Sequence, residues 1–150
     1  MPQKAVYLFV FSADWEPAHA MAEPRRHGGY RVETVGLNID PIESMGGIVV
    51  QPSRTLADID PNDVAIFILP GGDRWEQYPH EPELIRVLTE LDSRRIPIAA
   101  ICAATAAVVR AALLRGRGHT SNEWRTCANK YRTIVKRRRT SMRQRSGITA

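Results

Sequence analysis

Cysteine is scarce in this 150-residue chain, which contains only Cys102 and Cys127. Two cysteines at this separation match neither a metal-binding spacing nor a disulfide framework. We therefore expect no metal, no cofactor and no disulfide, and a reducing, cytoplasmic location is the default. The length suits one domain with its own hydrophobic core.

Long hydrophobic runs are also missing. No apolar stretch approaches the roughly 20 residues that a membrane-spanning helix needs. The N-terminal stretch MPQKAVYLFVFSAD has one lysine and a short apolar run that is broken at residues 12–14. This pattern predicts a strand and not a signal peptide, so we expect no membrane partner.

Acidic residues are nearly absent from the end of the chain. Residues 123–150 hold nine of the 21 lysines and arginines but one acid, Glu123, which gives a formal charge of +8. Residues 1–122 carry 12 basic and 15 acidic side chains, a charge of −3, and show no basic stripe. Nucleic acid binding requires such a stripe, so we do not expect this partner. The tail could contact phosphates, but blocks of like charge are usually unstructured.

The sequence does contain apolar strands that alternate with helical stretches. Strands are expected at residues 5–12, 30–37, 64–69 and 96–102, with a hairpin around Gly46-Gly47. Helices are expected at residues 16–27, 81–95 and 103–114. This alternation predicts an α/β fold whose parallel sheet is covered on both faces.

Three chemically marked features follow predicted strands. They are Glu16, the glycine pair Gly71-Gly72, and Cys102. Functional groups gather at the carboxyl ends of the strands in such sheets, so we expect these residues to share one site.

Each of these residues has a chemical and a purely structural interpretation. Cys102 at a strand-to-helix turn could be an exposed thiolate, or simply a small residue of the core. Glu16, beside Trp15, could act as a general acid or base, or only stabilise a helix N-terminus. The glycine pair could offer N–H groups to an oxyanion, or form a plain turn.

Two histidines could also line the site. His19 lies one helical turn beyond Glu16, and His119 follows the last predicted helix. Either of them could equally lie at the surface.

Taken together, the motifs ADWE, LPGG and AICAAT resemble the ThiJ/PfpI superfamily, which includes the Parkinson-associated protein deglycase and is related to class I glutamine amidotransferases. The likeness covers residues 4–122 and is greatest to the bacterial amidotransferase-like branch. It implies a flavodoxin-like three-layer sandwich with a mainly parallel central sheet, usually a homodimer, and a reactive cysteine on a nucleophile elbow.

The resemblance also implies roles for individual residues. Cys102 matches the nucleophile, and Glu16 matches the carboxyl group that hydrogen-bonds it. Gly71 and Gly72 match the turn on the oxyanion side, where the backbone N–H of Ala103 would assist.

The chain departs from the family pattern where a base is expected. Many members place a histidine directly after the cysteine, and this chain has Ala103. A histidine used by other members would fall near Asn122, three residues after His119. No complete Cys-His-acid triad can be transferred, and a thiolate without a positioned base loses its proton shuttle.

The end of the chain departs as well. Residues 123–150 show no clean periodicity and no helix stop. A one-nucleotide shift in the back-translated tail yields a helical, family-like sequence. We therefore hypothesise that residues 1–122 form the family domain, that residues 123–150 are a frameshift-derived tail, and that the C-terminal elements of the fold are missing or disordered.

Two functions remain open from the sequence. The first is a cysteine-dependent hydrolase or lyase acting on a small carbonyl or amide substrate, such as a 2-oxoaldehyde. The second is a non-catalytic redox sensor or stress-related chaperone, in which Cys102 is oxidised to a sulfinate that Glu16 stabilises.

Overall fold

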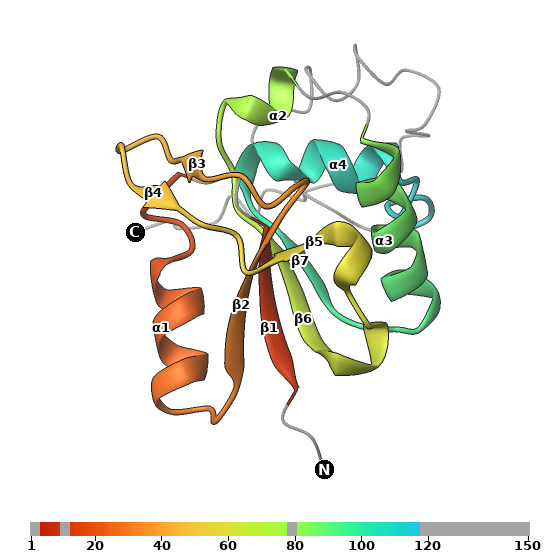
Figure 1. Cartoon of the computed structure of the whole chain (residues 1–150). Helices are drawn as coiled ribbons and strands as arrows, with labels where there is room; N and C mark the ends of the chain where they lie inside the picture. Colours follow the sequence, from red (N-terminus) through yellow and green to blue (C-terminus); the bar gives the residue numbers. More distant parts are fainter. Residues whose placement is uncertain (1–3, 10–12, 78–80, 118–150) are drawn as a thin grey trace, which may run out of the picture.

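The computed structural model describes residues 4–9, 13–77 and 81–117 (Figure 1). Its first apolar run forms the central strand β1 (Ala5–Phe9), which is buried along its whole length. β2 (Arg31–Gly36) and β6 (Val64–Leu69) flank it, and β5 (Arg54–Thr55) and β7 (Ile98–Ala100) lie outside them. The sheet has the order β5-β2-β1-β6-β7, and every neighbouring pair is parallel.

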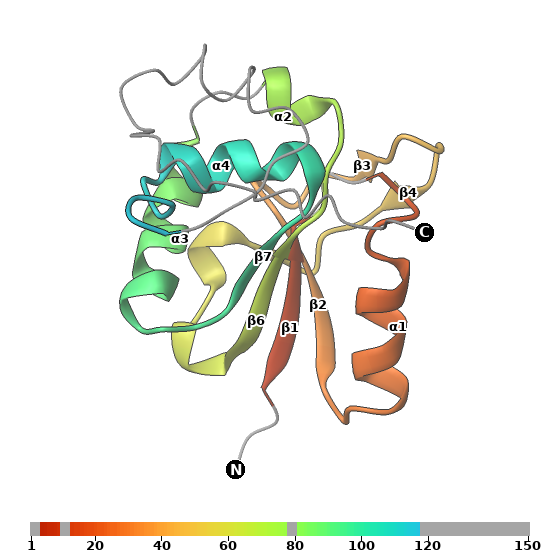
Figure 2. The same ribbon diagram turned by 180° about the vertical axis from the view of Figure 1, so that it is seen from behind.

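Helices cover both faces of this sheet (Figures 1 and 2). α1 (Ala18–Arg26) packs on the face formed by Val6 and Leu8 of β1, through Ala20 and Met21. α3 (Pro82–Ser93) and α4 (Thr105–Arg110) cover the opposite face, where the larger core cluster lies. The alternation of side chains along each strand divides the core in this way.

The predicted helix at residues 81–95 is confirmed as α3. Pro82 occupies its first turn, where a missing N–H costs nothing. One stripe of the helix faces the sheet and consists of Leu84, Val87, Leu88 and Leu91. At its end, Arg95 adopts a φ of 58°, and Ile96 N–H donates to the carbonyl of Leu91 at 2.9 Å. This is a Schellman ending with arginine where glycine is usual.

Smaller elements complete the described chain. β3 (Ile42–Glu43) and β4 (Val49–Val50) form the predicted antiparallel hairpin around Gly46-Gly47. A short helix α2 (Arg74–Gln77) follows the Pro-Gly-Gly turn. Single 3₁₀ turns span Leu56–Asp58, Pro61–Asp63 and Cys102–Ala104.

Three predictions about elements were wrong in detail. β7 was expected to be buried on both faces, but it is only partly buried, because it is an edge strand among the described residues. The helix expected at residues 103–114 begins as a 3₁₀ turn and ends at Arg110, because Ala112 turns to a φ of 60°. β5 was missed, since two residues carry no periodic signal. The hypotheses about residues 123–150 lie outside the described residues.

Candidate active site

The order of the strands determines where a site can form. β1 continues through α1 to β2 on one side, and β6 lies on its other side, so the chain reverses direction across the sheet between β1 and β6. Ligands of open α/β sheets bind outside the carboxyl ends of the strands at such a point. The segments that follow β1, β6 and β7 all begin at this end of the sheet (Figure 1).

Cys102 forms a sharp turn directly after β7. Its φ is 52°, a left-handed conformation that is rare for a residue with a side chain. Ile101 N–H donates to the carbonyl of Leu69 at 2.9 Å, and the hydroxyl of Thr105 donates to the carbonyl of Cys102 at 2.8 Å. These bonds tie the turn to β6 on one side and to α4 on the other. The cysteine itself is exposed.

A helix ending does not explain this conformation. The other two non-glycine residues with positive φ in the described part of the chain, Arg95 and Ala112, both close helices. Cys102 instead lies between a strand and a helix. This is the geometry of a nucleophile elbow, which raises a side chain out of the sheet. Backbone strain of this kind costs on the order of 1–3 kcal/mol and is concentrated at functional sites.

Gly71 is the point at which the predicted residues meet. A Cβ atom added to Gly71 would lie 2.8 Å from the Cβ of Cys102, and 2.8 and 2.9 Å from the two carboxylate oxygens of Glu16. Only a residue without a side chain fits between them. The structure therefore brings Cys102, Glu16 and Gly71 together, as the sequence predicted.

Hydrogen bonds hold Glu16 in this position. The N–H of Gly71 donates to Oε2 of Glu16, and the carbonyl of Gly71 accepts from Ala13 N–H at 2.9 Å. Since the Gly71 N–H is engaged by Glu16, it is not the first choice for an oxyanion donor. The next residue, Gly72, has a φ of 148°, which side chains rarely allow.

Sequence reasoning missed a second carboxylate beside the site. Asp14 accepts a hydrogen bond from the hydroxyl of Ser44 and another from Gly46 N–H at 2.6 Å. The Ser44 bond, followed by the Gly46 bond, lowers the pKa of Asp14. The signal in the sequence was an aspartate two positions before Glu16 together with a glycine pair in a hairpin. Neither feature indicates a contact between them.

Of the two histidines that could line the site, the structure describes one. His19 is an exposed residue of α1. His119 and Asn122 lie outside the described residues. Ala103 follows the cysteine within the 3₁₀ turn, and its methyl group can neither accept nor donate a proton. Glu16 is thus the titratable side chain that the described residues place against Cys102.

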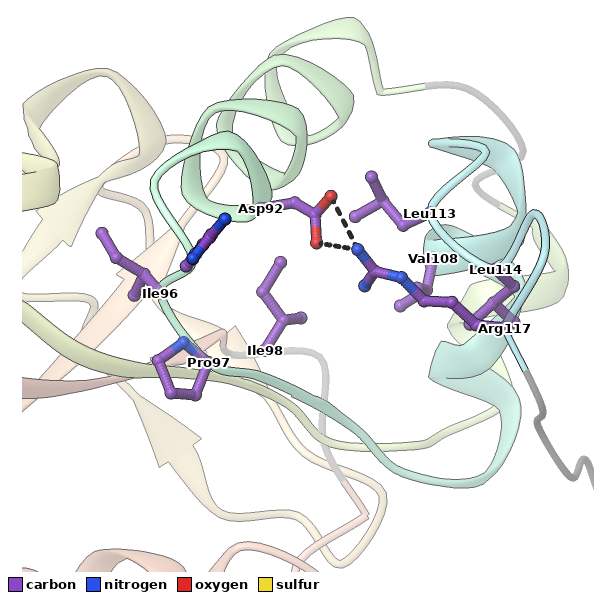
Figure 3. A pocket seen from close by; sticks show the side chains of 9 residues that line it. Asp92, Ile96, Pro97, Ile98, Val108, Leu113, Leu114 and Arg117 are labelled. Atoms are coloured by element: carbon purple, nitrogen blue, oxygen red, sulfur yellow. Dashed lines mark hydrogen bonds and ion pairs between the residues drawn. The ribbon is translucent and has the colours of Figure 1, made fainter.

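A pocket of about 360 Å³ lies elsewhere in the molecule (Figure 3). It is formed at the amino end of β7 by the C-terminal ends of α3 and α4, and two of the residues that line it, Asp92 and Arg117, form an ion pair at 2.9 Å. Neither Cys102 nor Glu16 is among its lining residues.

Within the described residues, no group of three or more acidic, histidine or cysteine side chains is arranged to hold a metal ion. Likewise, none of the helices in that part of the chain has the length and hydrophobicity to cross a membrane.

The sequence is similar to those of two proteins of Bacillus subtilis. The chain is 35% identical to YoaZ of Bacillus subtilis, which is named as an uncharacterized protease, over 82% of this chain and 62% of that protein. YdeA of the same organism, also named as an uncharacterized protease, is 30% identical over 80% of this chain and 59% of its own length. The chain thus spans about three fifths of these relatives.

Two solved structures resemble this chain in fold. A DJ-1 superfamily protein from Agrobacterium tumefaciens superposes with a TM-score of 0.79 at 28% identity, covering 88% of this chain and 70% of that one. A ThiJ/PfpI family protein from Bacillus anthracis gives 0.69 at 32% identity, covering 86% and 65%. The model of the DJ-1/PfpI family matches residues 4–138, a range that crosses the predicted boundary at residue 122. With this match and the parallel sandwich fold, the chain belongs to the DJ-1/PfpI family.

Proposed function

We propose that this protein is a cysteine-dependent hydrolase or lyase that acts on a small carbonyl or amide substrate. The observation that carries the proposal is that Cys102 and the Glu16 carboxylate both border the position that a side chain of Gly71 would occupy. A nucleophile on an elbow with an acid close to it is the minimum for covalent catalysis with proton transfer.

In the proposed reaction, the Cys102 sulfur attacks the carbonyl carbon and the carbonyl electron pair moves to oxygen. The N–H groups of Gly72 and Ala103 would stabilise this oxyanion. With an amide substrate, Glu16 would take the thiol proton as sulfur attacks and give it to the nitrogen as the carbon–nitrogen bond breaks, which releases the amine and leaves a thioester. Water would then hydrolyse the thioester, releasing the acid and the Cys102 thiol. With a 2-oxoaldehyde, sulfur would add to the aldehyde carbon to give a thiohemiacetal, and Glu16 would move the proton on that carbon to the neighbouring carbonyl carbon. The product is the thioester of a 2-hydroxy acid, which water would hydrolyse.

Relatives named as proteases support an amide substrate, although the chain covers only part of their length. The exposed position of Cys102 supports access for a small molecule. A homodimer and a cytoplasmic location also remain proposals. Light scattering on the purified protein tests the first, and fractionation of the source cells tests the second.

Turnover of methylglyoxal and of glutamine by the wild type and by Cys102→Ser tests the function. We expect turnover of one of the two substrates, and its loss by on the order of 10³-fold or more in the variant. Equal rates in the two proteins would contradict the proposal. Cys102→Ala is the matched control for residual activity of the serine hydroxyl.

A second candidate is a redox sensor, and Ala103 favours it because no base follows the cysteine. Each equivalent of peroxide would transfer one oxygen to the Cys102 sulfur and leave as water, giving first a sulfenate and then a sulfinate. Mass spectrometry after peroxide treatment distinguishes the candidates. Stoichiometric sulfinate at Cys102 without turnover of either substrate favours the sensor.

A further inference from the structure

Two carboxylates of one short loop are held against two glycines on different elements. Glu16 lies against Gly71, at the end of β6, and Asp14 lies against Gly46, in the turn between β3 and β4. In both cases the glycine N–H donates to the carboxylate that covers it. The loop at residues 13–16 is therefore fastened at both sides, on one side to the candidate site and on the other to the hairpin.

The contact between Asp14 and Gly46 is as restrictive as the one at Gly71. A Cβ atom on Gly46 would lie 2.5 Å from Oδ2 and 3.0 Å from Cγ of Asp14. Gly46 does not adopt a positive φ, so its backbone conformation does not require glycine. Glycine is required at this position because the Asp14 carboxylate occupies the space that a side chain would need.

Ser44 connects Asp14 to the rest of the hairpin. Its hydroxyl accepts from Ile48 N–H at 3.0 Å and donates to Oδ1 of Asp14, while its own N–H donates to the carbonyl of Ile48 at 2.9 Å. Both oxygens of Asp14 are thus used by one rigid turn. A carboxylate that accepts two directed hydrogen bonds has a fixed position and orientation.

We infer that Asp14 is a positioning residue for the site: by fastening the loop at residues 13–16 to the turn at residues 44–48, it holds the Glu16 carboxylate against Gly71 and Cys102. The inference rests on the proposed function of Glu16 and Cys102. Asp14 itself touches the hairpin and not the cysteine, so its effect on the chemistry is indirect. It also assigns a role to the β3–β4 hairpin, which lies at the carboxyl end of the sheet (Figure 1).

The pH dependence of Cys102 alkylation by iodoacetamide tests this inference. The variants are Asp14→Asn, Ser44→Ala and Glu16→Gln, each in the full-length chain with Cys127→Ser to leave one thiol. Asp14→Asn removes the charge and replaces one acceptor oxygen by a donor, so either the Gly46 N–H loses its acceptor or the bond to the Ser44 hydroxyl must reverse. We expect the midpoint of the profile to move in the same direction as in Glu16→Gln but by less, with at least a twofold change of rate at pH 7.

Asp58→Asn is the matched control. The Asp58 carboxylate also accepts from a hydroxyl and a backbone N–H, both of Thr55, at 2.7 and 3.0 Å, and these bonds stay within one turn away from the loop at residues 13–16. Because both bonds fall on Oδ2, which the asparagine carbonyl can replace, this variant should lose the charge, keep the turn and leave the alkylation profile unchanged. Ser44→Thr keeps the hydroxyl that Ser44→Ala removes, so it should show the wild-type alkylation profile.

Two results would overturn the inference. One is a wild-type alkylation profile in Asp14→Asn under conditions where Glu16→Gln changes it. The other is an equal change in Asp58→Asn, which would show a general effect of removing a carboxylate charge. Failure of the proposed function looks different, because it is an absence of turnover in the wild type, whereas the alkylation profile can be measured without any substrate.

Discussion

The two ends of the central sheet use their carboxylates in opposite ways. At the amino end, Asp63 accepts from the hydroxyl of Tyr7 at 3.0 Å and from Arg31 at 2.6 Å, and Arg31 also binds Glu33 at 2.8 Å. At the carboxyl end, Asp14 and Glu16 accept from backbone N–H groups and a hydroxyl, and neither forms an ion pair within the described part of the chain.

The difference lies in the partners: an arginine pairs with the carboxylates at the amino end, whereas backbone N–H groups and a hydroxyl hold those at the carboxyl end. An arginine favours the ionised form of its partner, and Arg31 accordingly lowers the pKa of Asp63. Such a carboxylate is poorly suited to carry a proton at neutral pH. Glu16 has no cation beside it among the described residues, and it faces a cysteine. We therefore expect the carboxylates at the amino end to affect stability and Glu16 at the carboxyl end to affect turnover.

Among the variants that keep Cys102, the largest effect should follow from Glu16→Gln. The amide keeps the shape of the side chain but cannot release or accept a proton in the same way, so turnover should fall by roughly 10²-fold or more. Steady-state kinetics with whichever substrate the wild type turns over measures this. A variant with wild-type kcat/KM would show that Glu16 only fills space.

The next effect is expected from Gly71→Ala. Its methyl group would lie 2.8 Å from the Cβ of Cys102, so the elbow or Glu16 must shift, at a cost of about 1–3 kcal/mol and a loss of turnover. Gly36→Ala is the matched control, because its methyl group would lie 2.5 Å from the carbonyl of Asn38, outside the site. Urea unfolding should show both variants destabilised, with turnover reduced only in Gly71→Ala beyond its loss of folded protein.

A smaller effect, on stability alone, is expected from Tyr7→Phe. Burial, followed by the hydrogen bond to Asp63, raises the pKa of Tyr7 to about 12. The tyrosine thus contributes stability that is complete below about pH 10 and is lost as the pH rises towards 12. Tyr7→Phe should lower the unfolding free energy by about 1 kcal/mol at pH 7. The unfolding free energy of this variant should also decrease less than that of the wild type as the pH rises from about 10 towards 12. A changed rate of Cys102 alkylation in Tyr7→Phe would contradict the expectation that the amino end of the sheet affects stability alone.

Asp63 makes the stability of the same network depend on pH in the acid range. Its folded-state pKa is depressed, chiefly by Arg31, so its contribution is present above about pH 4 and disappears as the pH falls through the lowered value. Asp63→Asn should therefore reduce the acid dependence of urea unfolding between about pH 5 and 2.

The smallest effect is expected from Arg95→Gly. Arg95 has the same left-handed backbone as Cys102, but it only closes α3. Glycine relieves this conformation, and the gain in unfolding free energy should be about 0.5–1 kcal/mol. Cys102→Gly relieves the same strain and should abolish the chemistry. If Arg95→Gly were less stable than the wild type, the contacts of the arginine side chain would stabilise the fold by more than its left-handed backbone destabilises it.

Much of the fold could be predicted because burial imposes clear patterns. The apolar runs that became β1 and β6, the stripe of α3 and the turn at Gly46-Gly47 were all visible in the sequence. The two-residue strand β5 and the early end of α4 were not. They depend on pairing across the sheet and on the conformation of Ala112, which local sequence does not encode.

The candidate site was predictable in part for a similar reason. Cys102, Glu16 and Gly71 each follow a strand, and a parallel sheet brings such positions together. Asp14 could not be found in this way. Its partners Ser44 and Gly46 belong to a hairpin outside the main sheet, and only the folded structure brings them to the loop.

The most direct test of the account is the reactivity of Cys102 itself. Iodoacetamide labelling at pH 7, read by mass spectrometry at this residue, compares the folded protein with the same protein in urea. We predict that Cys102 reacts at least tenfold faster when folded, because the turn places backbone N–H groups near an exposed sulfur and urea disperses them. An equal or slower rate in the folded protein would contradict the assignment of this end of the sheet to chemistry.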